Sequence, residues 1–335
     1  MTHSWSVAAD DRTGALEVGG LVAATFGPVT VSTGAVVGES GVVDLGTRVM
    51  SAERAASTVA AFDAASSSRH RLHKMDSTLR GNWAAELIAR AAATERRVVL
   101  LPGWPQVGRT CVGGVVHVHG APIGAVRDQL PAATIVHDVE GLRAWIGRDR
   151  AGERFVSCDI RSTEQMVAAA QALIDSECLI AGPAGPLAAV LAAQFSHHAA
   201  SPQRPPVSAR SAMVVCGSAN PVAVAQVERV RVSLPDVRVL ATPPADGDLS
   251  IDAARRLASD ARSSLVERPA DVVVIVGGDT AAAFLGDGPR VACGMAAPGM
   301  PWSLGAEGEG PVVVTKAGGF GTPDALVHLL SGENV

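Results

Sequence analysis

The stretch KMDSTLRGN, residues 74–82, combines a lysine, an aspartate, two hydroxyl side chains and an arginine. Asp76 or Ser77 could cap the helix predicted over 82–93, but a cap accounts for neither Lys74 nor Arg80. An arginine guanidinium grips a carboxylate through paired hydrogen bonds. The stretch therefore indicates a pocket for a small acid that also carries hydroxyl groups.

Two further polar turns follow apolar runs in the first part of the chain. Asp10 and Asp11 come directly after the run 5–9, and adjacent carboxylates at a strand end are unfavourable without partners. A helix cap explains one of them, but not readily both. Arg109, in GWPQVGRT, is a candidate ligand for a carboxylate or phosphate, with a surface salt bridge as the alternative.

Three glycine-containing turns lie in the last 120 or so residues, each between a β-branched run and a helix-like run. Main-chain N–H groups at such helix starts attract phosphate. A single turn can be explained by geometry alone, but three favour a nucleotide site. Neither GxxxxGK[ST] nor GxGxxG is present, which disfavours P-loop NTPases and ordinary dehydrogenases. Their candidate phosphate ligands are Ser218, Gly277, Gly278, Asp279, Thr280, Gly318, Gly319 and Gly321, and Lys316 could neutralise phosphate nearby.

The elements that must position these residues alternate between apolar runs and Ala-rich helical runs. This alternation predicts the α/β class, with two α/β domains of mainly parallel sheets and a cleft between them. The proline-rich segment 201–211 is the candidate linker. We therefore expect a sugar-acid-binding domain over 1–205 and a nucleotide-binding domain over 212–335.

Composition excludes several classes of protein. A net charge of −5 and 3% aromatic residues argue against a nucleic-acid partner. We expect no membrane span, because no long run is purely apolar. The five cysteines are scattered without a CxxC, which is typical of reduced thiols in the cytoplasm. His117 and His119 have metal-like spacing but no third ligand, so we predict no protein metal site.

Together, acids and guanidinium groups in the first domain and phosphate turns in the second predict phosphoryl transfer from a nucleotide to a hydroxylated acid. The motifs ADDRTGA, KMDSTLRGN, GRT, GGDT, PGMPW and KAGGFG also stand in the order found in the four-carbon acid sugar kinases. The chain resembles that family from Ala9 to Asp324. The family includes threonate, erythronate and 3-oxo-tetronate kinases.

The resemblance implies an ATP-dependent kinase acting on a four-carbon sugar acid. It assigns ATP to the glycine turns, and the sugar acid to Asp10, Asp11, Lys74, Asp76, Ser77, Arg80 and Arg109. Mg²⁺ would bridge the ATP phosphates, since it prefers oxygen ligands and retains waters. As the base that accepts the hydroxyl proton we favour Asp76 or Asp11, with Asp279 as the competitor.

Two other functions stay open at this point. A sugar-acid sensor of the same fold without turnover is suggested by departures from the family pattern at Val107, Asn220 and Gly319. A different α/β enzyme, such as a dehydrogenase, is suggested only by the glycine turns. A homodimer is a further possibility.

Overall fold

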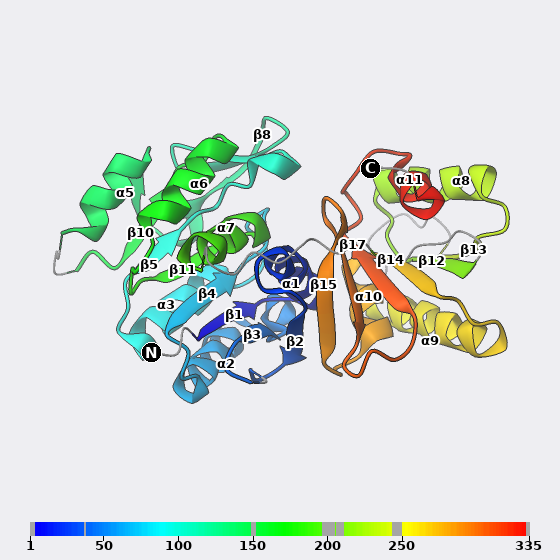
Figure 1. Ribbon diagram of the computed structural model, residues 1–335. Helices are drawn as coiled ribbons and strands as arrows, with labels where there is room; N and C mark the ends of the chain where they lie inside the picture. The colour runs from blue at the N-terminus through cyan, green and yellow to red at the C-terminus, as the bar shows by residue number, and fades with distance from the viewer. Residues whose placement is uncertain are drawn as a thin grey trace.

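The computed structural model describes residues 4–36, 38–148, 152–195, 205, 211–242 and 250–332. We call residues 4–195 the first half and residues 211–332 the second half. Strands of both halves join a single 14-stranded sheet (Figure 1). The predicted α/β class with mainly parallel strands is confirmed. The predicted linker 201–211 lies outside the described residues except at 205 and 211, so the domain boundary stays a prediction.

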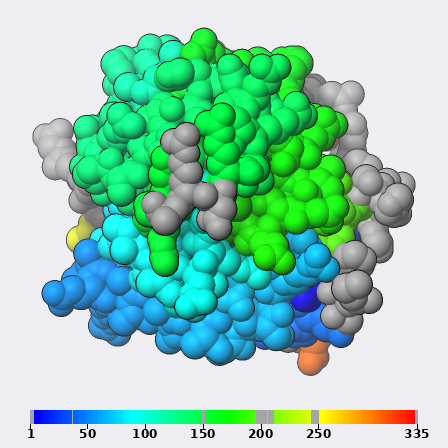
Figure 2. Space-filling model, turned by 90° about the vertical axis from the view of Figure 1, so that its left-hand side faces the viewer, coloured from blue at the N-terminus to red at the C-terminus, as the bar shows by residue number. Residues whose placement is uncertain are grey.

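The first half supplies eight parallel strands of the large sheet, and Figure 2 shows the end of the molecule that this half forms. These strands are β1 (Trp5–Ala9), β2 (Val29–Thr33), β3 (Gly41–Asp44), β4 (His70–Lys74), β5 (Val98–Leu100), β9 (Thr134–Val136), β10 (Phe155–Cys158) and β11 (Leu179–Gly182). A small antiparallel sheet contains β6 (Arg109–Val112), β7 (Val115–Val118) and β8 (Ala121–Ala125).

Helices cover both faces of the first half of the sheet. They are α1 (Arg12–Phe26), α2 (Ala52–Ala65), α3 (Trp83–Thr94), α5 (Val139–Ile146), α6 (Thr163–Ala172) and α7 (Ala184–Gln194), with the short α4 (Val126–Gln129) and the 3-10 turns η1 (Thr47–Val49) and η2 (Pro105–Val107). Val7 of β1 packs in one core cluster with Leu16 of α1 and Leu187 of α7. The adjacent Ala8 packs in another with Phe62 of α2, as alternation along a strand requires.

The second half has the same layered build. Its strands are β12 (Ala212–Cys216), β13 (Arg238–Ala241), β14 (Val272–Val276), β15 (Arg290–Ala297), β16 (Met300–Gly305) and β17 (Val312–Lys316), and its helices are α8 (Pro221–Ser233), α9 (Ile251–Glu267), α10 (Gly278–Leu285) and α11 (Ala325–Ser331). Val274 of β14 packs with Leu326 of α11, whereas Val273 packs with Leu257 of α9. Burial on both faces explains why β14 is an unbroken apolar run.

The two halves meet at antiparallel strands β2, β15 and β16, which we call the seam. Val31 of β2 pairs with Arg290 of β15, and β15 pairs in turn with β16. Figure 1 shows β2 and β15 where the two halves meet. Helix α1 packs tightly on the seam, because a Cβ added at Gly19 would come within 2.9 Å of the Ala292 side chain. The seam therefore holds the second half directly against the helix that follows β1.

Strand direction reverses across the seam. The antiparallel pairings β2–β15, β15–β16 and β16–β17 make the parallel strands of the two halves run in opposite senses. A sheet twists by roughly 20–25° from each strand to the next. Over the steps from β1 to β14 the rotation sums to about 120–150°, which brings the reversed strand β14 back towards the direction of β1. The carboxyl ends of β1 and β14 can therefore face each other.

None of the described helices is both long enough and apolar enough to cross a membrane. The five cysteines are all free thiols.

Candidate active site

Asp10 and Asp11 follow the last residue of β1 and are held in different ways. Asp11 is the N-cap of α1: its Oδ1 accepts from the Gly14 N–H at 2.9 Å and its Oδ2 accepts from the Thr13 hydroxyl at 2.7 Å. Asp10 is only 2% exposed and makes no such cap. The cap therefore accounts for one of the two carboxylates, and the other needs a partner from elsewhere.

That partner is Arg48, a residue that the sequence analysis missed. Arg48 lies in η1, shortly after β3, and β3 pairs with β1. Its Nε donates to Asp10 Oδ2 at 2.8 Å, and its Nη1 donates to Asp11 Oδ2 at 2.8 Å. Burial raises the pKa of Asp10, and Arg48 opposes that rise. One guanidinium thus compensates two adjacent carboxylates.

Asp76 lies just beyond β4 and is bound by a second arginine. Arg80 donates from Nε to Asp76 Oδ2 at 3.0 Å and from Nη2 to Asp76 Oδ1 at 2.9 Å. Burial alone would raise the pKa of Asp76, but the bonds from Arg80 and the charge of Arg48 outweigh it and lower the pKa. Asp76 is therefore ionised at neutral pH. The Thr78 hydroxyl also donates to Asp76, and Ser77, which is predicted to bind the acid, is half-buried in the same turn.

We call Asp10, Asp11, Arg48, Asp76 and Arg80 the acid–arginine cluster. Arg48 joins its two parts, because Arg48 Nη2 also lies 3.7 Å from Asp76 Oδ1. The side chain of Arg80 is 69% exposed, so its outer face is open to an incoming anion.

Lys74 ends β4 beside this cluster and is almost fully buried. Its Nζ donates to the Met75 carbonyl at 3.1 Å and lies 3.9 Å from Glu17 Oε2. Glu17, on α1, is a second residue that the sequence analysis missed. Burial raises the pKa of Glu17 to about 7, although the charge of Lys74 acts against this.

Arg109 begins β6 and reaches across to the second half. Its Nη1 donates to the Val107 carbonyl, and its buried Nε has no partner among the described residues. The guanidinium carbon lies 4.6 Å from the ring centroid of Phe320, which belongs to the third glycine turn. A cationic side chain at this position touches both of the predicted binding regions.

The three glycine turns follow β12, β14 and β17, which are neighbours in the sheet. A Cβ added at Gly217 would strike the Thr280 hydroxyl, and one at Gly318 would strike the Ser218 hydroxyl. Gly277 has φ +114°, a conformation that favours glycine, and a Cβ there would lie 3.4 Å from the Ser218 nitrogen. The predicted turns therefore form one cluster of close main-chain approaches.

The remaining predicted residues border that cluster. The buried Thr280 Oγ1 has no hydrogen-bond partner in the part of the chain that is described, while Asp279 is exposed in the first turn of α10. A Cβ at Gly319 would lie 3.4 Å from the Asn220 amide nitrogen. Gly321, with φ +81°, packs against Ala325 at the start of α11.

Lys316 is the last residue of β17 and is 1% exposed. Its Nζ donates to the carbonyls of Ala317 at 2.9 Å and Gly318 at 3.1 Å. Burial lowers the pKa of Lys316 to about 8. The ammonium therefore stands directly behind the third glycine turn.

The residues predicted for the acid and those predicted for phosphate are adjacent. A Cβ added at Gly278 would lie 3.6 Å from Thr13 Oγ1 and 3.9 Å from Asp11 Oδ2. The Arg109–Phe320 contact is a second bridge between the halves. An anion at the glycine turns and a hydroxylated acid at the acid–arginine cluster would thus be neighbours, as group transfer between them requires.

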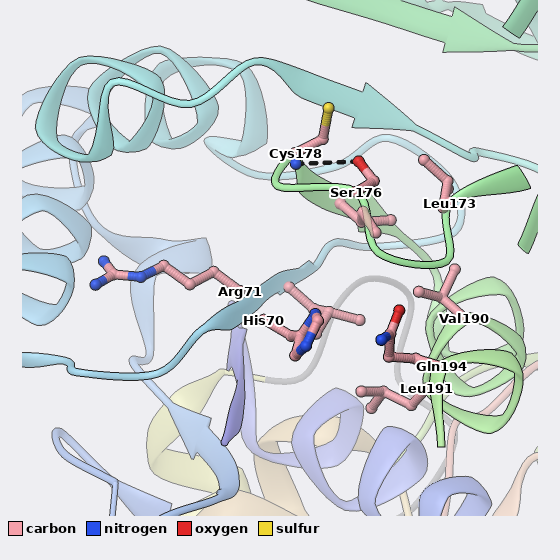
Figure 3. A pocket seen from close by; sticks show the side chains of 10 residues that line it. His70, Arg71, Leu173, Ser176, Cys178, Val190, Leu191 and Gln194 are labelled. Atoms are coloured by element: carbon pink, nitrogen blue, oxygen red, sulfur yellow. Dashed lines mark hydrogen bonds between the residues drawn. The ribbon is translucent and has the colours of Figure 1, made fainter. Parts of the chain in front are cut away.

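The pocket in Figure 3 lies elsewhere. It is lined by His70 and Arg71 at the start of β4 and by Leu173, Val190 and Gln194 from the α6–α7 region. Lys74 stands at the opposite end of the same strand. This pocket is therefore separate from the site.

Two comparisons relate this chain to known sequences. Residues 5–129 match the model of a family described as "Sugar-binding N-terminal domain". A curated D-threonate kinase from Cupriavidus necator is 29% identical over 340 aligned positions, which cover 89% of this chain and 80% of that protein.

Solved structures share the fold. A protein from Salmonella typhimurium LT2 has a TM-score of 0.79 at 18% identity, covering 99% of this chain and 100% of that one. A Haemophilus influenzae protein has a TM-score of 0.69 at 18% identity, covering 97% and 98%. A domain of unknown function from Bordetella bronchiseptica, with bound citrate and as a domain-swapped dimer, has a TM-score of 0.50 at 22% identity and full coverage of both chains. The curated kinase and the sugar-binding match agree with the resemblance to the four-carbon acid sugar kinases, and the solved structures show that the fold is shared.

Proposed function

We propose that this chain is an ATP-dependent kinase that phosphorylates a hydroxyl of a four-carbon sugar acid such as threonate or erythronate. The observation that carries the proposal is the position of Gly278, whose added Cβ would lie 3.9 Å from Asp11 Oδ2. A phosphate turn and a carboxylate of the acid–arginine cluster thus face each other across the two halves. The similarity to a D-threonate kinase supports the same reaction class.

The acid would bind at the first half. Arg80, with an exposed guanidinium face, and Arg109, with an unpartnered buried Nε, would bind the carboxylate of the acid. Lys74 has N–H donors left beyond its bond to the Met75 carbonyl, and these would bind a hydroxyl or the phosphate in transfer. Asp76 would hold Arg80 in place, and Asp10 and Asp11 would hold Arg48 beside it.

ATP would bind at the second half. The missing side chains at Gly217 and Gly318 leave room for the hydroxyls of Thr280 and Ser218. These hydroxyls and the main-chain N–H groups of the turns would bind the phosphate oxygens. Lys316 would add a positive charge behind the third turn. Phosphoryl transfer needs chiefly such positioning and charge neutralisation from the protein.

Mg²⁺ fits the donor set at this place, because exposed Asp279 offers carboxylate oxygens next to the phosphate turn. Within the described ranges there is no group of three or more His, Cys, Asp or Glu that could hold a metal alone. Asp279 would therefore hold the ion together with ATP phosphates and water. When bound, Mg²⁺ supplies neutralisation of phosphate charge.

A coupled assay of ADP release tests the proposal over a panel of four-carbon acids that includes D-threonate. ATP-dependent turnover with at least one acid is the expected result. Thermal stabilisation by an acid and by ATP with no ADP release would instead identify a non-catalytic binding protein of the same fold. Hydride transfer without use of ATP would refute the kinase.

We also propose the cytoplasm as the location, on the basis of the five free cysteines, and a homodimer as the assembly. The domain-swapped Bordetella structure motivates the dimer. Light scattering during gel filtration gives the mass in solution, and a monomer mass at working concentration would contradict the dimer.

A further inference from the structure

Asp76 and Asp11, which the sequence analysis favours as the proton acceptor, already accept several hydrogen bonds within the protein. Asp76 Oδ2 accepts hydrogen bonds from the N–H of Thr78, the hydroxyl of Thr78 and the Nε of Arg80. Asp11 Oδ2 accepts from the Thr13 hydroxyl and from Arg48, and Asp11 Oδ1 accepts from Arg48 and the Gly14 N–H. Both aspartates thus bind an arginine through both of their oxygens, and Asp76 Oδ1 accepts the fewest bonds, one from Arg80.

Glu17 differs from these carboxylates. It accepts no hydrogen bond from any residue in the described ranges, and its closest cation is Lys74, at 3.9 Å. Glu17 follows Gly14 by three residues on α1, so both lie on one helix face. Lys74 Nζ would lie 2.9 Å from a Cβ added at Gly14, which places this face towards the acid site. The Glu17 side chain is 14% exposed, so it is not sealed off completely from solvent.

We infer that Glu17 is the group that accepts the proton of the substrate hydroxyl during phosphoryl transfer. This inference rests on the proposed kinase function. The hydroxyl oxygen forms a bond to the γ-phosphorus of ATP, and the bond from that phosphorus to the β,γ-bridging oxygen breaks. ADP leaves with the electron pair of the broken bond, and the hydroxyl proton goes to a Glu17 carboxylate oxygen and then to water.

The charges around Glu17 suit this role. Lys74 from β4 and Arg109 from β6 favour the ionised carboxylate, whereas Asp11 and Asp76 disfavour it. Burial is the strongest influence and places the pKa of Glu17 at about 7. A proton acceptor works best when its pKa lies near the working pH. By contrast, the guanidinium groups around Asp76 lower its pKa, which makes it a weak acceptor.

Single-turnover phosphoryl transfer, followed by rapid quench from pH 5.5 to 9, tests the inference on the full chain. The wild-type rate should fall as pH decreases through about 7, as Glu17 becomes protonated. Glu17→Gln should slow transfer roughly 10²–10³-fold, within the range for loss of a general base. The acid limb should disappear in this variant, while the Kd values for ATP and the acid change less than about threefold.

Two more variants separate a proton acceptor from a merely structural residue. Glu17→Asp keeps a carboxylate, so it should retain an acid limb at a reduced rate. Asp76→Asn should weaken binding of the acid while leaving the acid limb in place. A Glu17→Gln protein that melts as the wild type does but keeps both its rate and its acid limb would overturn the inference. Absence of turnover by the wild type with every acid would overturn the kinase proposal instead.

Discussion

The two regions of the candidate site differ in the groups that they present: charged side chains in the first and the main chain of glycine turns in the second. At the ends of β1 and β4, charged side chains bind one another, and Arg48 alone donates to both Asp10 and Asp11. At the ends of β12, β14 and β17, the main chain itself makes the close approaches, as at Gly277. A carboxylate and hydroxyls need forked donors and acceptors, whereas a phosphate is held by N–H groups and needs room. Loss of a side chain should therefore damage the first region, and gain of a methyl group should damage the second.

Arg48→Ala should have the largest effect of these variants, a loss of stability that originates in the first region. It leaves Asp10 and Asp11 adjacent and partly buried without their shared cation, which costs about 3–5 kcal/mol of unfolding free energy. Urea denaturation measures the loss. Arg54→Ala, on the exposed side of α2, is the matched control and should change stability by less than about 0.5 kcal/mol. Equal stability of the two variants would contradict the role of Arg48.

Gly277→Ala should break the second region instead. Its φ of +114° strains an alanine by roughly 1–3 kcal/mol, and the added Cβ points to the Ser218 main chain. Binding of ATP, measured by titration calorimetry, should be lost or greatly weakened, while binding of the acid is retained. Gly288→Ala, where the Cβ would meet nothing within 4 Å, should bind ATP normally. Loss of binding of the acid alone would reverse our assignment of the regions.

Phe320→Leu tests the contact between the two regions. Phe320 belongs to the third glycine turn, and its ring packs against Arg109 of the first half. The change removes the ring beneath Arg109 and should weaken binding of the acid by about 0.5–2 kcal/mol, the range for such cation–ring contacts. Phe320→Tyr keeps the ring face and should bind the acid nearly as the wild type does. An unchanged Kd in the leucine variant would show that the contact has no part in binding.

Lys316 should have the smallest effect, which is a dependence of the affinity for ATP on pH. Burial lowers its pKa to about 8, so the ammonium charge that attracts phosphate is lost as pH rises through that value. Affinity for ATP should therefore fall between pH 7 and 9, by roughly three- to tenfold for one partly screened charge. In Lys316→Met the affinity should be flat over this range. A wild-type affinity for ATP that rises with pH would show that the Lys316 charge does not strengthen binding of ATP.

Position along the chain predicted where most residues of the candidate site lie, because ligands in α/β sheets gather at strand ends. Asp10 and Gly277 directly follow the apolar strands β1 and β14, and Lys74 is the last residue of β4. Arg48 could not be found this way, because its role depends on the pairing of β3 with β1, which no local pattern specifies. Glu17 did leave a signal, since it is the lone acid within an otherwise apolar stretch of α1. An acidic residue in an apolar stretch is unfavourable there unless it has a charged partner or a functional role.

The seam also has a consequence for the folding of the chain during its synthesis. Synthesis proceeds from the N-terminus, so the first half leaves the ribosome with the outer edge of β2 bare, and the strand that covers it, β15, comes near the end of the chain. An open strand edge can pair with any matching strand. The β15 of another copy carries the same residues as the chain's own, so it can pair with the same edge when several chains are made close together.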